Sequence, residues 1–164
     1  MRRTARAAAV ATGLTVGLVI AAAPVHATTV TRASGAFTVA VDFSSATFSP
    51  VGPRACRVGI DATLTSTGTV AGTATGRLGA LVLAPCAQAQ TTPPGTAADV
   101  FRFDGAFTGT VAGAPATGRL TYAGVTRVGG AIDATVVLRG TAHAALRAEA
   151  VAGVGGTYVG VARP

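Results

Sequence analysis

An alternation of apolar and polar residues with a period of two runs through this chain and most constrains its fold. In residues 37–43, Phe and Val alternate with Thr, Ala and Asp, and similar alternation returns at 60–64, 101–104 and 132–139. Successive side chains of an extended strand point to opposite faces, so each segment can turn one face to a core and the other to water. The chain is therefore predicted to be all-β, with short antiparallel strands.

Three peptides recur in the same order about seventy residues further along the chain. They are Gly-Ala-Phe-Thr (35–38 and 105–108), Arg-Val-Gly (57–59 and 127–129) and Ile-Asp-Ala-Thr (60–63 and 132–135). This order predicts two related halves, 35–90 and 105–164, joined by 91–99. A unit of this size is marginal alone, so the halves should share one core. The predicted architecture is a single small antiparallel β-sandwich or β-barrel.

The repeat also decides the one stretch whose composition favours a helix. Residues 142–151 are rich in Ala, Leu, Arg and Glu, but they align with a Thr/Val/Gly segment that begins at Val70. A strand is therefore predicted there. The alternation further predicts five inward-facing phenylalanines in the core, namely Phe37, Phe43, Phe101, Phe103 and Phe107.

Residues 1–27 have the layout of a cleavable secretory signal peptide. Three arginines lie within the first six residues, and residues 7–23 contain no ionisable side chain. Small or aliphatic residues then precede a predicted cleavage site between Ala27 and Thr28. We therefore expect a secreted or cell-envelope protein whose residues 28–164 form one all-β domain.

The charge of that domain is modest. Ten arginines face six acidic residues once the signal segment is removed, a net charge of +4 against +7 for the whole chain. The arginines are scattered singly along the sequence, so we expect no nucleic-acid partner. We also expect no membrane span after cleavage. Lys, Asn and Trp are absent and Arg replaces Lys, a composition that resembles secreted proteins of high-GC bacteria.

Two cysteines, Cys56 and Cys86, remain after cleavage. Outside the cytoplasm a pair of cysteines that can reach each other normally forms a disulfide. A Cys56–Cys86 bond is therefore predicted. It would close a loop of about thirty residues, which the chain-entropy model values at roughly 3.5 kcal/mol.

Residues with catalytic potential are few. His143 is the one histidine beyond the signal segment, and no nucleophile, phosphate-binding or calcium-loop motif is present. Asp61 and Asp133 are equivalent in the repeat, and such a pair resembles the layout of aspartic proteases, where two carboxylates share a proton. Both sites read Asp-Ala-Thr, however, and lack the Asp-Ser/Thr-Gly signature of that family. With Arg57, these three residues are the weak site candidates, and no cofactor or metal site is predicted.

The sequence therefore favours a non-catalytic binding or structural module over an enzyme. The chain contains only two tyrosines and no tryptophan, so an aromatic platform for glycans is not expected. Two alternatives stay open. A small barrel could carry an apolar ligand, or a secreted enzyme could use a site without a recognisable motif.

Overall fold

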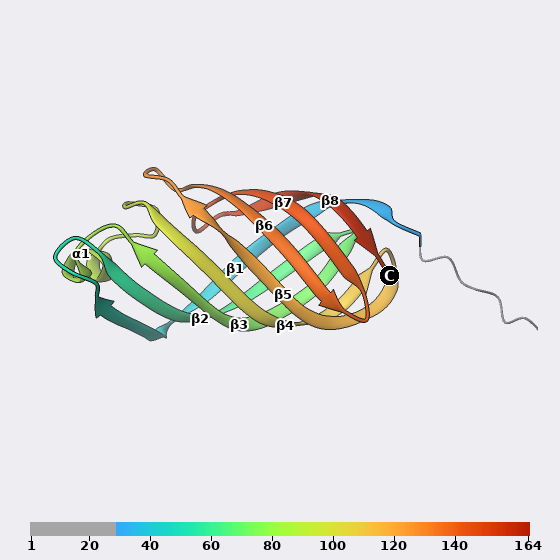
Figure 1. Ribbon diagram of the computed structural model, residues 1–164, viewed down its shortest axis with the longest axis horizontal. Coiled ribbons are helices and arrows are strands. Elements are labelled where there is room, and N and C mark those ends of the chain that lie inside the picture. The colour runs from blue at the N-terminus through green and yellow to red at the C-terminus, as the bar shows by residue number, and fades with distance from the viewer. Residues whose placement is uncertain (1–28) are drawn as a thin grey trace, which may run out of the picture.

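Residues 29–164 form a closed eight-stranded antiparallel β-barrel in the computed structural model (Figure 1). Each strand pairs with the next along the chain, and β8 pairs with β1. The elements are β1 (Thr31–Pro50), β2 (Cys56–Gly68), β3 (Val70–Val82), α1 (Cys86–Thr91), β4 (Asp99–Val111), β5 (Ala114–Thr126), β6 (Ala131–Gly140), β7 (His143–Val151) and β8 (Gly155–Arg163). The predicted all-β antiparallel fold is confirmed, and of the two architectures left open it is the barrel.

The predicted signal segment 1–27 and the cleavage site between Ala27 and Thr28 lie outside the described residues. Among residues 29–164, no helix is both long and apolar enough to cross a membrane.

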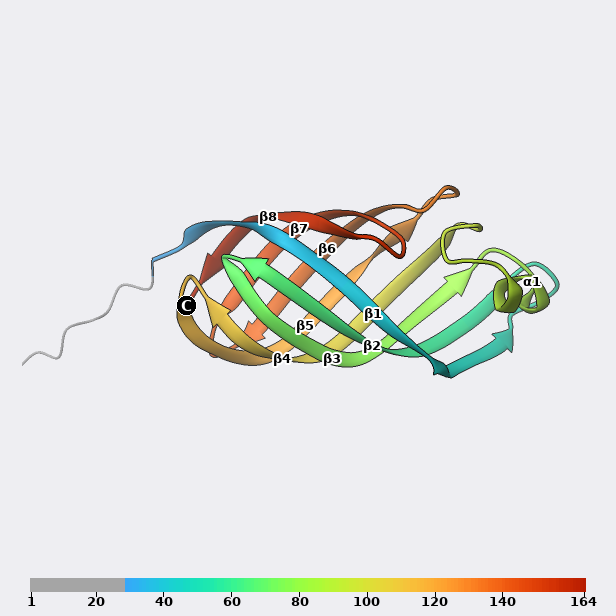
Figure 2. The same cartoon turned by 180° about the vertical axis from the view of Figure 1, so that it is seen from behind.

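The strands are strongly tilted across the barrel. Cross-strand neighbours, followed once around the barrel from Asp42, lead back to Arg32 on the same strand, a stagger of ten residues. Such a stagger requires strands that are oblique to the barrel axis, as Figure 2 shows. A row of directly opposite residues therefore spirals from one end of the barrel to the other.

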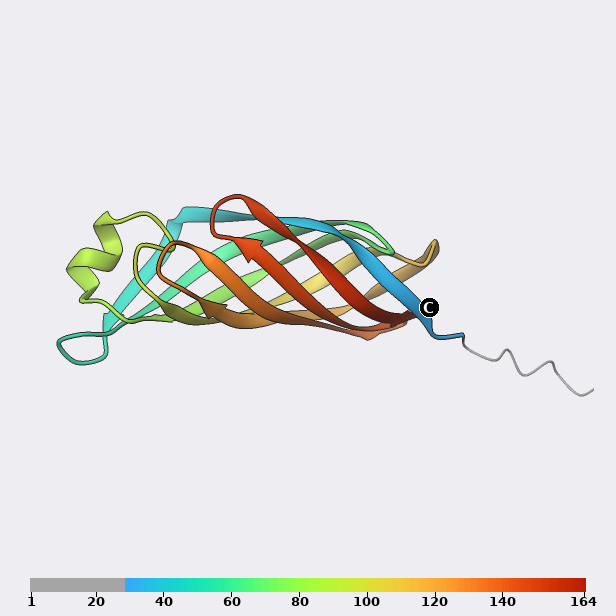
Figure 3. The same ribbon diagram turned by 90° about the horizontal axis from the view of Figure 1, so that it is seen from above.

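The two ends of the barrel differ in their connections. One end, which we call the α1 end, carries α1 and the turns at 51–55, 127–130 and 152–154 (Figure 3). The opposite end, which we call the terminal end, holds the start of β1, the end of β8 and only short turns. The tightest of these is Ala112–Gly113, where both residues have positive φ (50° and 82°), as in a two-residue hairpin turn.

Inward-facing side chains fill most of the barrel with one apolar core. The larger members are Phe37, Leu64, Val70, Phe101, Phe103, Phe107, Val111, Leu120, Tyr122, Val136, Leu138, Leu146 and Tyr158. Four of the five phenylalanines predicted for the core lie there. Phe43 does not: its side chain is 66% exposed, because the register of β1 against β2 is interrupted between Asp42 and Thr47. A bulge of this kind disrupts the alternation that the prediction extrapolated.

Inward-facing glycines let neighbouring strands approach closely. Gly76 of β3 is directly opposite Gly105 of β4, and a Cβ at Gly76 would overlap with the carbonyl oxygen of Asp104. The ring of Phe103 covers Gly105. Glycine kinks covered by an aromatic ring allow strands to curve sharply enough to close a small barrel.

Tyr158 connects β8 to the turn between β2 and β3. Its hydroxyl accepts a hydrogen bond from the backbone N–H of Val70 (2.9 Å) and lies 2.8 Å and 3.0 Å from the carbonyl oxygens of Thr67 and Val70, to which it can donate. A Cβ at Gly35 would overlap with this hydroxyl. Glycine at position 35 thus leaves room for a link between segments 88 or more residues apart.

The structure does not confirm the predicted two-halves repeat. Residues 35–38 lie in β1 and their matches at 105–108 lie in β4, three strands on, whereas 60–63 and 132–135 lie in β2 and β6, four strands apart. A twofold repeat of an eight-stranded barrel would place every match four strands on. The stretch 142–151, in contrast, is a strand (β7) from His143 to Val151, as predicted for all but its first residue.

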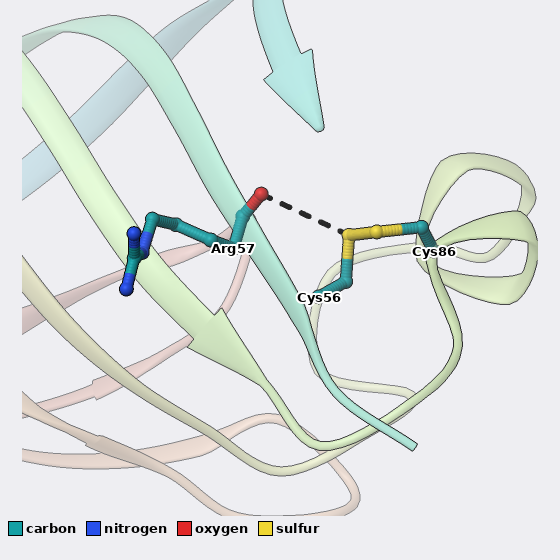
Figure 4. The surroundings of a disulfide bond; sticks show 3 residues. All are labelled: Cys56, Arg57 and Cys86. Carbon is teal, nitrogen blue, oxygen red and sulfur yellow. Dashed lines mark hydrogen bonds between the residues drawn. A yellow bond between two sulfur atoms is a disulfide. The ribbon is translucent and has the colours of Figure 1, made fainter. Parts of the chain in front are cut away.

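The predicted disulfide joins Cys56, at the start of β2, to Cys86, the first residue of α1 (Figure 4). It attaches the long connection 83–98 to the α1 end, where a hydrogen bond from Gly129 N to Gly95 O (3.0 Å) also holds it. The short helix α1 was not predicted. Its signal is the run Ala-Gln-Ala-Gln after Cys86, which is too short to outweigh the strand patterns around it.

Candidate functional site

A buried carboxyl group lies inside the barrel at the α1 end. Asp99, the first residue of β4, is directly opposite Thr126 of β5. Oδ1 of Asp99 is buried and has no hydrogen-bond partner among residues 29–164. Burial raises the pKa of the Asp99 carboxyl, and a hydrogen bond with Thr126 opposes this shift only in part. A buried carboxyl group without a partner is more stable when it is protonated, or when a ligand donates a hydrogen bond to it.

Tyr122, on the same strand as Thr126, packs between the rings of Phe37 and Phe101. Its ring centroid is 5.3 Å from that of Phe37 and 4.9 Å from that of Phe101. Burial, with the nearby charge of Asp99, raises the pKa of the Tyr122 hydroxyl far above its usual value. Apolar side chains around this end are only half-buried: Val39, Val41, Leu78, Ala80, Ile132 and Ala150. We call these six residues with Asp99 and Tyr122 the barrel mouth.

The two aspartates selected from the sequence do not meet. Asp61 lies on the outer wall of β2, where Arg77 donates a hydrogen bond to it (2.8 Å). Asp133 lies on β6, which is not a neighbour of β2, and pairs with Arg127 (2.6 Å). Each carboxylate is thus occupied by its own arginine and turned to solvent.

The other two candidates are also separate. Arg57 is exposed on β2, next to the disulfide, where its carbonyl oxygen lies 3.8 Å from Sγ of Cys56 (Figure 4). His143 is exposed at the start of β7, and no residue within 29–164 forms a hydrogen bond with its side chain. In the same part of the chain, no group of three or more His, Cys, Asp or Glu side chains could hold a metal ion.

Ion pairs cover the middle of the outer wall. Asp104 on β4 accepts hydrogen bonds from Arg102 (2.6 Å), Arg119 (3.2 Å) and Thr121 (2.8 Å). The bond from Arg102 makes the largest contribution to lowering the pKa of this carboxyl well below its usual range. Arg147 and Glu149 form a looser pair on β7. Five of the ten arginines in residues 29–164 therefore have an acidic partner.

A line of basic residues crosses β5 to β8, and of these only Arg119 has an acidic partner, Asp104. Arg119 is directly opposite Arg139, Arg139 is opposite His143, and His143 is opposite Arg163. All four are exposed. Arg32 of β1 is opposite Val161, so it is a diagonal neighbour of Arg163. We call these five residues the cation row.

The cation row accounts for the net charge of the domain. All six acidic side chains (Asp42, Asp61, Asp99, Asp104, Asp133 and Glu149) lie in the half of the barrel toward the α1 end, where six arginines balance them. The half toward the terminal end contains Arg32, Arg119, Arg139 and Arg163 and no acidic side chain. The +4 of residues 28–164 is therefore concentrated at one end.

Sequence spacing did not predict this surface, because its arginines lie far apart in the chain and only strand register aligns them. The signal was present in the outward positions of each strand, but its use required the pairing of all eight. No family model, curated protein or solved structure matches this chain, so any function must be inferred from the barrel's own geometry.

Proposed function

We propose that the protein is an exported, non-catalytic module of the cell envelope or extracellular space that acts through the outer wall of its barrel. The observation that carries this proposal is the filled interior: inward positions hold packed apolar side chains, whereas nearly all charged groups lie outside. The Cys56–Cys86 bond is in keeping with an oxidising compartment.

Expression of the full chain in a secreting bacterial host tests the export part of this proposal. Mass spectrometry of the fractions should find a product that begins at Thr28, with Cys56 and Cys86 oxidised, in the medium or envelope. A product that keeps residues 1–27 and two free thiols in the cytoplasm would overturn it.

A second candidate is a carrier of a small apolar ligand, and the barrel mouth favours it. Half-buried Val41, Leu78 and Ala80 could contact an apolar group, and the unpartnered oxygen of Asp99 could accept a hydrogen bond from it. Native mass spectrometry of the purified protein separates the two candidates. The outer-wall proposal expects the mass of the protein alone. A bound lipid-like molecule, lost in an Ala80→Phe variant but kept in Ala71→Phe, would favour the carrier.

A further inference from the structure

We propose that the cation row binds a linear anionic polysaccharide, one that carries carboxylate or sulfate groups along its length. This inference rests on the outer-wall function proposed above and names the partner of that wall. It starts from an arrangement that costs the folded barrel stability.

Like charges directly opposite on neighbouring strands are unfavourable. Arg119 and Arg139 form such a pair, in which only Arg119 has an acid beside it, Asp104. His143 is placed between Arg139 and Arg163, neither of which has an acidic partner among residues 29–164. Elsewhere on the same wall several arginines are matched to acids, as in Arg77–Asp61 and Arg127–Asp133. Arg57 has no acidic partner either, but it is opposite Ser49 and Leu81 and not another basic residue. Proteins tolerate local conflicts of this kind chiefly at functional sites.

The geometry of the row suits a chain of regularly spaced anions. Neighbouring strands are about 4.8 Å apart, so the three steps from Arg119 to Arg163 span roughly 14 Å. The spacing of about 4.8 Å between neighbouring residues of the row is comparable with the length of one pyranose ring in an extended chain. The guanidinium group can bind carboxylate or sulfate with two parallel hydrogen bonds. Arg32, Arg139 and Arg163 have no acidic partner among the described residues, so their donors are available.

Other polyanions fit this end of the barrel less well. Single-stranded nucleic acid is usually held by aromatic side chains that stack on bases, but both tyrosines are buried and the most exposed phenylalanine, Phe43, lies toward the α1 end. A lipid surface would be met by apolar turn residues. The turns of the terminal end are instead Gly68-Thr69, Ala112–Gly113 and Gly140–Ala142, all small or polar. The exposed turn valines, Val128 and Val154, lie at the other end. At the terminal end the exposed valines are Val30, just before β1, and Val161 on β8, and neither is in a turn between strands.

Two variants with the same change in net charge test the proposal. Arg139→Gln/Arg163→Gln removes two unpaired arginines from the cation row. Arg54→Gln/Arg57→Gln removes two exposed arginines from the α1 end that likewise have no ion pair among residues 29–164. Isothermal titration calorimetry at low and at physiological salt would use heparin and polygalacturonate as probes, neutral dextran as a blank, and a short single-stranded DNA as the competing class.

We expect the wild type to bind both anionic polysaccharides, with an affinity that falls as salt is raised. The Arg139/Arg163 variant should bind about tenfold or more weakly, because each lost arginine removes a charge-assisted contact. The Arg54/Arg57 variant should stay within about twofold of the wild type, on the same scale. Three results would overturn the proposal: no binding to either polysaccharide, equal loss in both variants, or DNA binding as tight as polysaccharide binding. None of these three results depends on export or on whether the barrel mouth holds a ligand. The polysaccharide proposal can therefore fail while the proposed function stands, and the reverse.

Discussion

Replacing Tyr158 by Phe removes one oxygen atom from the link between β8 and the β2–β3 turn. The Tyr158 side chain is 3% exposed, and its hydroxyl is the acceptor for the backbone N–H of Val70 at 2.9 Å. The ring would stay in place, because Phe has the same shape. The variant therefore isolates the hydrogen bonds from the packing of β8.

The expected cost comes mainly from the group left behind. Val70 is almost fully buried, and an unpaired buried donor costs about 1–3 kcal/mol. The substitution also removes the hydrogen bond that the hydroxyl donates to the carbonyl oxygen of Thr67 or Val70. This second loss costs less, because each carbonyl oxygen has another lone pair that can accept a hydrogen bond. We expect the free energy of unfolding to fall by about 2 kcal/mol, which corresponds to about 5–8 °C in Tm for a domain of this size.

Tyr122→Phe is the matched control, because Tyr122 is equally buried (3% exposed) and its hydroxyl has no hydrogen bond among residues 29–164. Removal of a hydroxyl that forms no hydrogen bond should change stability by less than about 1 kcal/mol in either direction. Thermal and urea unfolding, followed by circular dichroism, measure both variants. Equal losses in the two variants, or no loss in Tyr158→Phe, would refute the role assigned to the Tyr158 hydroxyl.

Three further perturbations address the disulfide, the barrel mouth and the glycine kink. Cys56→Ala/Cys86→Ala should lose about 3–4 kcal/mol, because the unfolded chain regains the entropy of a loop whose ends are 30 residues apart; equal stability of the variant and the oxidised wild type in urea would contradict this. Asp99 has a raised folded pKa, so its contribution to stability is full below the unfolded pKa of 3.8 and is lost as pH rises through the folded value. The Tm of Asp99→Asn minus that of the wild type should therefore increase as pH is raised from 3 to 7, and a difference that decreases toward neutral pH would disprove the raised pKa. Gly76→Ala should lose about 2 kcal/mol or more in urea unfolding, because its Cβ would overlap with β4, whereas Gly79→Ala on the same strand has room, with its nearest neighbour at 3.9 Å, and should be neutral or stabilising.

The fold could be predicted from the sequence wherever one local rule was enough. The alternation at 101–104 and 132–139 places Phe101 and Phe103 inside and Asp133 outside, as observed. The rule failed at Phe43, because a bulge is a property of the β1–β2 pairing and leaves no mark on the alternation itself. Closure into a barrel rather than a sandwich was also beyond local rules, since it depends on β8 reaching β1.

The candidate site was less accessible to such reasoning. Arg119, Arg139 and Arg163 are isolated in sequence, and their separation supported the expectation of a merely solvated surface. Only the register of three successive pairings brings them opposite one another. A one-residue change in any of these hairpins would turn one arginine to the core face, so the row depends on turn lengths that composition does not reveal.

If the cation row is a binding surface, the barrel should be more stable without it. Arg139→Gln/Arg163→Gln relieves the repulsion between Arg139 and Arg119, which are directly opposite, and removes no ion pair among residues 29–164. We expect its Tm to match or exceed that of the wild type at low salt, and the difference to vanish as salt screens the wall. Arg77→Gln, which breaks the pair with Asp61, should show no such gain. A double variant that is less stable than the wild type at low salt would mean that the row has a structural role, and the conflict from which the binding proposal starts would not exist. A variant that gains stability while it loses polysaccharide affinity would show a surface retained for its ligand at the expense of the fold.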